Sequence, residues 1–262
     1  MAKIKQPNLT AGSMYSQSAR LIFKRNRSLL VQPVLILVIL GIMMTYIHNH
    51  KLDIIEKVTI NTKFIFKAIE DHLVLSFSAA AIILLIAIPG GIIFTRPKMK
   101  RFTPIALALA NVGQAFPAVG LLILAGIWFG FGKPVAIGTF AAFGTLPILR
   151  NTIVGLQEID PFIVESAMGM GMTPGQALRK IELPLAVPVI LAGVRTTLIL
   201  TVGVATLGVF VNGGGLGMLI IPGLKLNRQI VLLVGGMLTI IVAFTMDWLA
   251  RLAEEFLRPR GI

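Results

Sequence analysis

The most informative pattern of residues in this sequence lies between residues 160 and 184. Asp160 stands before Pro161, and Thr173 stands before Pro174. In each pair the first side chain can cap a helix N-terminus, and the proline fits the first helical position. Gly171 lies between the two pairs and suits the left-handed position that ends a helix. The spacing predicts two short helices joined by a sharp glycine elbow, a shape suited to transmitting force.

The second short helix is predicted to stop at Pro184, where a long apolar segment begins. On the first short helix, Glu165 is followed by Ser166 and Ala167, and small residues allow a partner to approach closely. Two interpretations of this segment are open. It is either a rigid lever that a cytoplasmic motor grips or an amphipathic loop that rests on the membrane surface, and its shape favours neither.

Other residues that could do chemistry are sparse. The chain has no cysteine, so a thiolate metal site and a cysteine nucleophile are both excluded. His48, His50 and His72 are typical of histidines at a membrane interface, because a metal site needs ligands that converge. No Ser/His/Asp arrangement or carboxylate pair indicates an enzyme.

The elements that position these residues are long apolar segments. Of the 262 residues, 56% are hydrophobic and 13% are charged, a balance typical of a protein in a bilayer. The net charge of +13 does not indicate a nucleic-acid partner, because Lys and Arg flank the apolar segments. The sequence predicts an all-α polytopic membrane helical bundle with six spans: Leu29–Ile47, Leu73–Thr95, Pro104–Phe129, Val135–Leu149, Leu185–Val211 and Ile230–Trp248.

The distribution of Lys and Arg predicts the orientation of the spans. With a cytoplasmic N-terminus, 16 of them face the cytoplasm and seven face outside, while Arg195 lies within the fifth span. This excess favours both termini inside. We expect one membrane domain with a cytoplasmic tail over residues 1–28 and a cytoplasmic loop over residues 150–184. The outer side has a partly helical segment, His48–Asp71, and a glycine-rich segment that is outer or re-entrant, Asn212–Leu224.

The cytoplasmic loop resembles the EAA loop of binding-protein-dependent ABC importer permeases. The motif is Glu-Ser-Ala, three residues, Gly, nine residues, then Ile-x-Leu-Pro. It falls on Glu165, Ala167, Gly171, Ile181, Leu183 and Pro184, and Ser166 stands where the family usually has Ala. The resemblance implies a MetI-like ABC permease fold in which this loop is a coupling helix that docks into a cleft on the ATPase subunit.

The same resemblance implies the partners and the location. These are an ABC ATPase dimer, a second permease subunit that is a copy or a paralogue, an extracytoplasmic substrate-binding protein, and the bacterial inner membrane. The chain carries no Gly-x-x-x-x-Gly-Lys-Ser/Thr phosphate loop, since the run from Gly130 to Pro134 has neither the spacing nor the hydroxyl. No cofactor is therefore expected in this chain, and ATP and Mg belong to the partner ATPase.

Some residues within or beside the predicted spans could line a translocation path: Gln114, Pro117, Arg195, Thr197, Thr201, Asn212 and Gly214. Alternatives are open for each group. Arg195 could snorkel or contact another helix, and the threonines could bond backwards to helix carbonyls. The glycines after Asn212 could be a flexible turn or bent backbone that lines a cavity. Asp247 is expected to be an ordinary interfacial residue.

Three further motifs are similar to those of osmoprotectant permeases. They are Gln114-x-x-Pro117, the run from Leu146 to Leu156, and the run from Gly213 to Leu224, within a likeness from about Ser76 to Leu224. The resemblance implies a small quaternary amine such as glycine betaine, carnitine or choline as substrate, with amino acids such as methionine as the alternative. A stand-alone secondary transporter is less expected, because such proteins more often bury carboxylates as ion couplers. With two Trp and two Tyr in the chain, an aromatic cage for the cation would belong to the binding protein.

Overall fold

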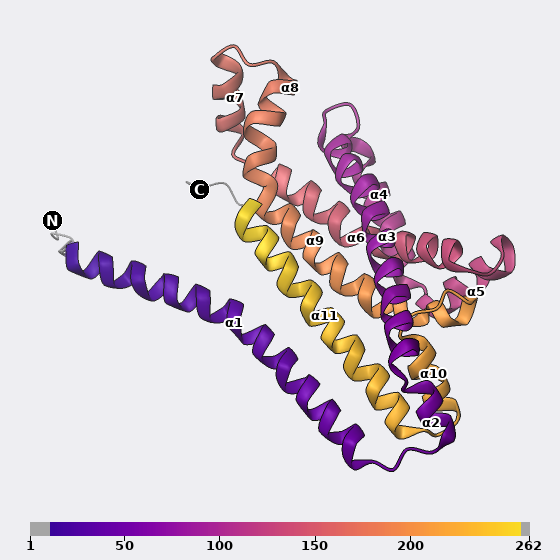
Figure 1. Ribbon diagram of the computed structural model, residues 1–262. Coiled ribbons are helices and arrows are strands. Elements are labelled where there is room, and N and C mark those ends of the chain that lie inside the picture. The colour runs from indigo at the N-terminus through magenta and orange to yellow at the C-terminus, as the bar shows by residue number, and fades with distance from the viewer. Residues whose placement is uncertain (1–10, 258–262) are drawn as a thin grey trace, which may run out of the picture.

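The computed structural model describes residues 11–257, and side chains within residues 30–255. Every regular element in this part of the chain is a helix (Figure 1). In chain order they are α1 (Ala11–Asn49), α2 (Ile54–Thr59), α3 (Thr62–Thr95), the 3₁₀ turn η1 (Lys100–Phe102), α4 (Thr103–Ala115), α5 (Ala118–Phe129), α6 (Lys133–Gln157), α7 (Pro161–Gly169), α8 (Pro174–Ala177), the π-helical turn η2 (Leu178–Glu182), α9 (Leu183–Ala205), the 3₁₀ turn η3 (Thr206–Val211), α10 (Gly217–Lys225) and α11 (Gln229–Leu257).

Five helical stretches in the described chain are long and apolar enough to cross a membrane. They are Leu30–Asn49, Thr62–Thr95, Lys133–Gln157, Pro174–Val211 and Gln229–Glu255. One bent pair of shorter helices would raise the number to six. The all-α, polytopic fold class is therefore confirmed, with one span in broken form.

The predicted third span is wrong in its shape. Instead of one helix over Pro104–Phe129, the chain forms α4 and α5, which meet at an angle of 94°. The cause is Pro117, because a proline disfavours helical backbone at the residue before it. Phe116 accordingly has φ −69° and ψ 141°, which is extended backbone, and α4 ends at Ala115.

Two other predicted spans are shorter than the helices that contain them. The predicted fourth span, Val135–Leu149, is extended by α6 to Gln157, so the first residues of the predicted loop are helical. The helix continues past the polar residues at 150 and 151 because Ile153 and Leu156 are buried against neighbouring helices. Likewise α3 begins at Thr62, well inside the predicted outer segment, which is thus partly helical as expected.

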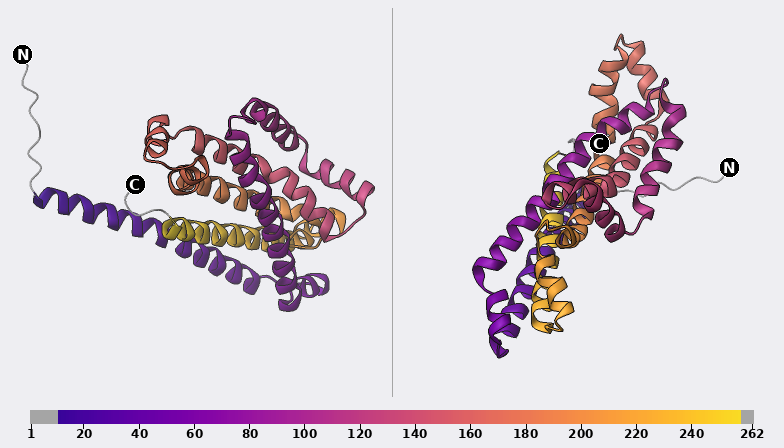
Figure 2. Two further views of the ribbon diagram at one scale, coloured as in Figure 1. Left: turned by 90° about the horizontal axis from the view of Figure 1, so that it is seen from above. Right: turned by 90° about the vertical axis from the view of Figure 1, so that its right-hand side faces the viewer.

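The centre of the bundle is formed where α3, α6 and α9 pack together. Gly91 of α3 faces Thr152 of α6, and Gly155 of α6 faces Val189 of α9, so that an added Cβ would lie only 2.6 Å and 3.0 Å from those side chains. Small residues at such contacts let helix backbones approach closely in membranes. The helices α7 and α8 project from one end of this bundle, and α2 and α10 lie at the other (Figures 1 and 2).

The first helix is peripheral to the bundle. The part of α1 from Leu30 onward is mostly exposed, although Met43 is buried in the cluster formed with α11. Its N-terminal part extends away from the other helices in the views of Figures 1 and 2. Of the predicted tail, residues 1–10 lie outside the described residues and residues 11–28 belong to α1.

Candidate coupling and translocation site

The predicted helix–elbow–helix is present and is built from local hydrogen bonds. The Asp160 carboxylate accepts the Phe162 N–H at 2.9 Å and caps α7. At the other end, Gly171 has φ +90°, its N–H bonds the Met168 carbonyl, and the Met172 N–H bonds the carbonyl five residues back. This pair of bonds is a Schellman motif, for which glycine is the preferred residue. The elbow prediction is confirmed.

The second helix begins as predicted but does not end as predicted. Thr173 and Gln176 form a capping box at the start of α8, with a bond from the Thr173 N–H to Gln176 Oε1 at 2.9 Å. Pro184 does not stop the helix, because the wide turn of η2 intervenes and the Leu183 N–H bonds the Leu178 carbonyl. A π-turn of this kind accommodates the missing N–H and the ring of the proline, so α8 runs through η2 into α9.

Apolar side chains are exposed along α7 and at its C-terminal cap. Phe162 is 72% exposed and Met170 is 74% exposed, and Ile163 and Met168 are also exposed. Among the motif residues, Glu165, Ser166 and Gly171 are exposed and Ala167 is buried, while Ile181, Leu183 and Pro184 are half-buried at the base. Exposed apolar side chains on a projecting element are typical of a protein–protein contact.

A charged pair missed by the sequence analysis lies at the base of this segment. Both oxygens of Glu182 accept hydrogen bonds from the guanidinium of Arg96, at 3.1 Å and 2.6 Å. Arg96 follows α3 directly, and Glu182 ends η2. The pair borders a cleft of about 610 Å³ that Lys100 and Glu165 also line. The feature of the sequence that could have indicated this pair is Glu182 itself, an acidic residue at the boundary of a predicted apolar span.

The two threonines proposed for the path lie within the bundle. Thr197 and Thr201 are buried on α9, where both methyl groups approach Gly144 of α6. The Thr197 hydroxyl donates to the Gly144 carbonyl at 3.4 Å, and that of Thr201 bonds backwards to the Leu198 carbonyl at 2.9 Å. Within this chain, the two threonines therefore contribute to the packing of α9 on α6.

The other candidates sit at two breaks in the helices. Gln114 is half-buried near the end of α4, and Pro117 is exposed at the bend before α5. Asn212 and Gly214 have positive φ, +58° and +83°, and a Cβ on Gly214 would lie 2.8 Å from an oxygen of Asp71. The glycine segment is thus a fitted turn rather than a loose one.

The neighbours of this turn are polar residues of α3. Asp71 accepts hydrogen bonds from Lys133 and also pairs with Lys67 at 3.1 Å. His72 is fully buried and its Nδ1 accepts the Leu216 N–H at 3.3 Å. These contacts hold the start of α6 and the glycine segment against α3.

Arg195 contacts another helix, which was one of the alternatives for it. Its guanidinium donates to both oxygens of Asp247 on α11. Asp247 also accepts from Gln32 of α1 and from Arg251. The carboxylate is 6% exposed and joins three helices, so the expectation of an ordinary interfacial residue is wrong.

A second ion pair joins Arg228, which directly precedes α11, to the predicted outer segment. Asp53 accepts the Glu56 N–H at 2.8 Å and pairs with Arg228. The hydrogen bond from the Glu56 backbone, helped by the Arg228 charge, lowers the pKa of the Asp53 carboxyl below its ordinary value.

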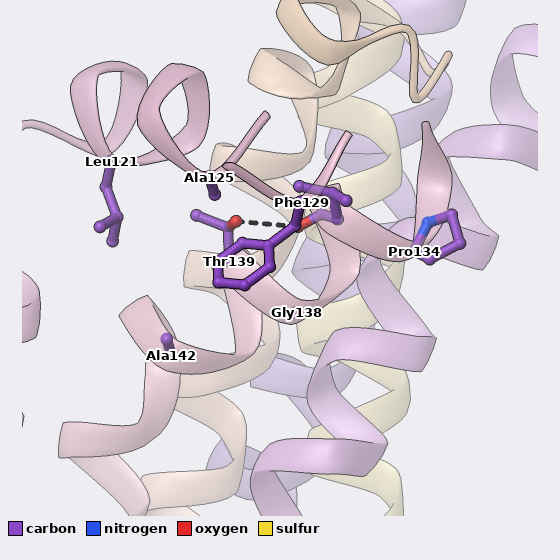
Figure 3. A pocket seen from close by; sticks show the side chains of 8 residues that line it. Leu121, Ala125, Phe129, Pro134, Gly138, Thr139 and Ala142 are labelled. Carbon is purple, nitrogen blue, oxygen red and sulfur yellow. Dashed lines mark hydrogen bonds between the residues drawn. The ribbon is translucent and has the colours of Figure 1, made fainter. Parts of the chain in front are cut away.

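An apolar cavity of about 450 Å³ lies between α5 and α6 (Figure 3). Its lining residues are Leu121, Ala125, Phe129, Pro134, Val135, Gly138, Thr139 and Ala142. The one hydroxyl among them, on Thr139, already donates to the Val135 carbonyl at 2.8 Å. Among the described residues there is also no group of three His, Asp or Glu side chains placed to hold a metal ion.

Comparison with known proteins identifies the class. Residues 87–259 match the family described as binding-protein-dependent transport system inner membrane component, and the chain belongs to it. It is thus the membrane-spanning permease subunit of an ABC importer and not itself catalytic; ATP is handled by a partner ATPase, and the system includes a binding protein.

Among its relatives is the choline transport system permease protein OpuBB of Bacillus subtilis (strain 168), 38% identical over 192 residues, which are 73% of this chain and 88% of that protein. Another is the osmoprotectant import permease protein OsmY of Salmonella typhimurium (strain LT2), 37% identical over 73% of this chain and 81% of that protein. The fold is similar to that of the inward-facing methionine ABC transporter MetNI, with a TM-score of 0.65 and 23% identity over 76% of this chain and 100% of that chain. This similarity confirms the MetI-like fold.

Proposed function

We propose that this permease imports a small quaternary-amine osmoprotectant such as glycine betaine, choline or carnitine. The observation that carries the proposal is the identity of 32–38%, over about three quarters of the chain, to permeases whose names specify choline, glycine betaine, carnitine or osmoprotectants. The motifs around Gln114, Pro117 and the glycine segment lie within residues 87–259, the part of the chain that matches the family.

The chemistry of such a substrate is compatible with this chain. A quaternary ammonium has no N–H to donate, and aromatic cages recognise it best. The candidates for the path supply few charges, so capture of the cation would fall to the binding protein, and the permease would offer a mainly uncharged route. Among the candidates for the path, Pro117 and Asn212 are exposed.

We also propose that α7 is the coupling helix that docks on the ATPase. Its exposed apolar end supports this role, since Phe162 and Met170 have few contacts within the chain. The Schellman elbow at Gly171 would fix the angle at which Glu165 is presented. The projection of α7 and α8 beyond the end of the bundle favours the lever interpretation over a loop that rests on the membrane (Figure 1).

Orientation and subunit number are part of the proposal. Both termini would lie in the cytoplasm, and a second permease, a copy or a paralogue, would complete the path. A reporter fused after Ile262 should behave as cytoplasmic, and one inserted within residues 58–69 as external. An external C-terminus would contradict the orientation.

The substrate is tested by uptake in cells with and without the gene. Radiolabelled glycine betaine, choline and carnitine are supplied at high osmolarity, and loss of the gene should reduce uptake of at least one of them. Unchanged uptake of all three, together with reduced uptake of an amino acid such as methionine, would refute the proposed substrate class.

A further inference from the structure

The coupling segment follows α6 after residues 158–160, and two further attachments lie at its other end. The first is covalent, through η2 into α9. The second is the ion pair between Arg96, which follows α3, and Glu182, which ends η2. Its partners are 86 residues apart in the chain, and the two parallel N–H···O bonds form a fork that fixes orientation as well as distance.

The covalent attachment passes through the least regular part of the helix. The π-helical turn Leu178–Glu182 lies between α8 and α9, and such turns are frequent at functional sites and at bends in helices. A force applied to α7 would therefore reach α9 across a turn that can change its geometry. Glu182 is the last residue of this turn, so the ion pair joins α3 to the point where the turn passes into α9.

The geometry of the ion pair is held from both sides. Glu182 is 7% exposed, so its carboxylate is confined by the packing around it. Arg96 is oriented by the neighbouring Thr95 hydroxyl, which accepts from Nε at 3.3 Å and from a terminal nitrogen at 3.0 Å. Beneath the pair, Ile88 and Ile92 of α3 pack with Ile190 of α9, so the two helices share one apolar cluster.

We propose that the Arg96–Glu182 pair is a strut that makes α3 move together with the coupling segment and α9 when the ATPase pulls on α7. Arg96 and Glu182 are then positioning residues for the coupling of ATP hydrolysis to transport. This inference rests on the proposed docking of α7 on the ATPase. Arg96 is about one third exposed on the cleft side, and an ion pair with an exposed charge contributes little to the stability of the fold. The pair therefore acts mainly by fixing the position of α3 relative to Glu182.

The test uses the complete importer in proteoliposomes, with ATPase, binding protein and both permease subunits. The readout is the number of ATP molecules hydrolysed per radiolabelled glycine betaine, choline or carnitine taken up. Glu182→Gln and Arg96→Gln should keep ATP hydrolysis and lose about tenfold in uptake, a factor within the usual range of coupling between sites. Lys100→Gln, which removes a positive charge from the same cleft, should behave as wild type.

Exchange of the two charges separates the strut from a purely structural role. The double variant Arg96→Glu with Glu182→Arg should regain most of the uptake lost in the single variants. A double variant that is no better than the single variants, or single variants with the wild-type ratio of ATP to substrate, would overturn the proposal.

A second readout does not depend on the substrate. Because the chain has no cysteine, Lys98→Cys and Arg179→Cys give this subunit its only two thiols for a pair of spin labels, and the other subunits are used in cysteine-free form. With the strut intact, the distance between the labels should be the same in the nucleotide-free and the vanadate-trapped importer, and in Glu182→Gln it should change or broaden. If the label distance in Glu182→Gln is the same in the nucleotide-free and the vanadate-trapped importer, the strut is refuted. If the wild-type importer takes up none of the three solutes, only the proposed substrate is refuted.

Discussion

The contact between α3 and α6 can be tested with two adjacent glycines. Gly90 and Gly91 both lie within α3, but a Cβ would meet different surroundings at the two positions. At Gly91 it would lie 2.6 Å from Cβ and Cγ2 of Thr152 and 3.4 Å from the Leu149 carbonyl oxygen. At Gly90 it would meet one methyl group of Leu149 at 3.8 Å, which is ordinary contact.

The geometry sets the expected difference between Gly91→Ala and Gly90→Ala. Each substitution gains roughly 1 kcal/mol of intrinsic helix propensity, so this contribution cancels between the two variants. Only Gly91→Ala must move α3 away from the buried, β-branched Thr152, and overpacking of this kind costs about 1–3 kcal/mol. A central value of about 2 kcal/mol corresponds to a difference of about 4–8 °C in thermal midpoint for a chain of this size.

The assay is the thermal midpoint of the purified permease in detergent, followed by the helical circular dichroism signal. Gly90→Ala should melt at or above the wild-type midpoint, and Gly91→Ala should melt several degrees below it. If Gly91→Ala melted as high as Gly90→Ala, the close packing of α3 on α6 at Thr152 would not exist as described.

Three further predictions concern the elbow, the buried carboxylate and the outer ion pair. Gly171→Val should abolish uptake while membrane insertion persists, because a β-branched residue at φ +90° costs about 1–2 kcal/mol in backbone strain. The control Gly175→Val, on the open side of α8, should retain uptake. Equal uptake by the two variants would show that the elbow has no role in coupling. Asp247→Asn should lower stability by about 2–3 kcal/mol. This loss is smaller than for a fully buried pair because the arginine partners of Asp247 are about one third exposed. An unchanged thermal midpoint would contradict the predicted loss of stability. Since the pKa of Asp53 is lowered in the folded protein, its contribution to stability is present above roughly pH 4 and is lost as the pH falls through the lowered value. The difference in stability between wild type and Asp53→Asn should therefore shrink in acid. A difference in stability that does not change with pH would argue against the ion pair.

Features that depend on a few neighbouring residues can be predicted from the amino-acid sequence alone. The helix–elbow–helix follows from Asp160, Gly171 and Thr173, because caps and left-handed glycines act within one turn of backbone. The number of apolar segments follows from composition, since a bilayer requires about 20 apolar residues for each span. The EAA motif likewise indicated the family without any knowledge of the fold.

Some local signals in the sequence conflict with one another. Pro117 lies in an apolar stretch long enough to span a membrane, and this length predicts one helix although the proline bends it. The polar residues at 150 and 151 predict the start of a loop, whereas the helix continues to Gln157. There the burial of Ile153 and Leu156 outweighs the local drop in hydropathy, and burial depends on which helices lie alongside.

Tertiary structure decided which charges meet. Arg96 and Glu182 are 86 residues apart, and Arg195 and Asp247 are 52 residues apart. In the sequence each of these residues is a charge within a span or near its end, with several possible partners. Only the packing of α3, α9 and α11 selects the pairs, because an ion pair forms where two helices bring opposite charges within hydrogen-bond distance in a medium that disfavours leaving either charge unpaired.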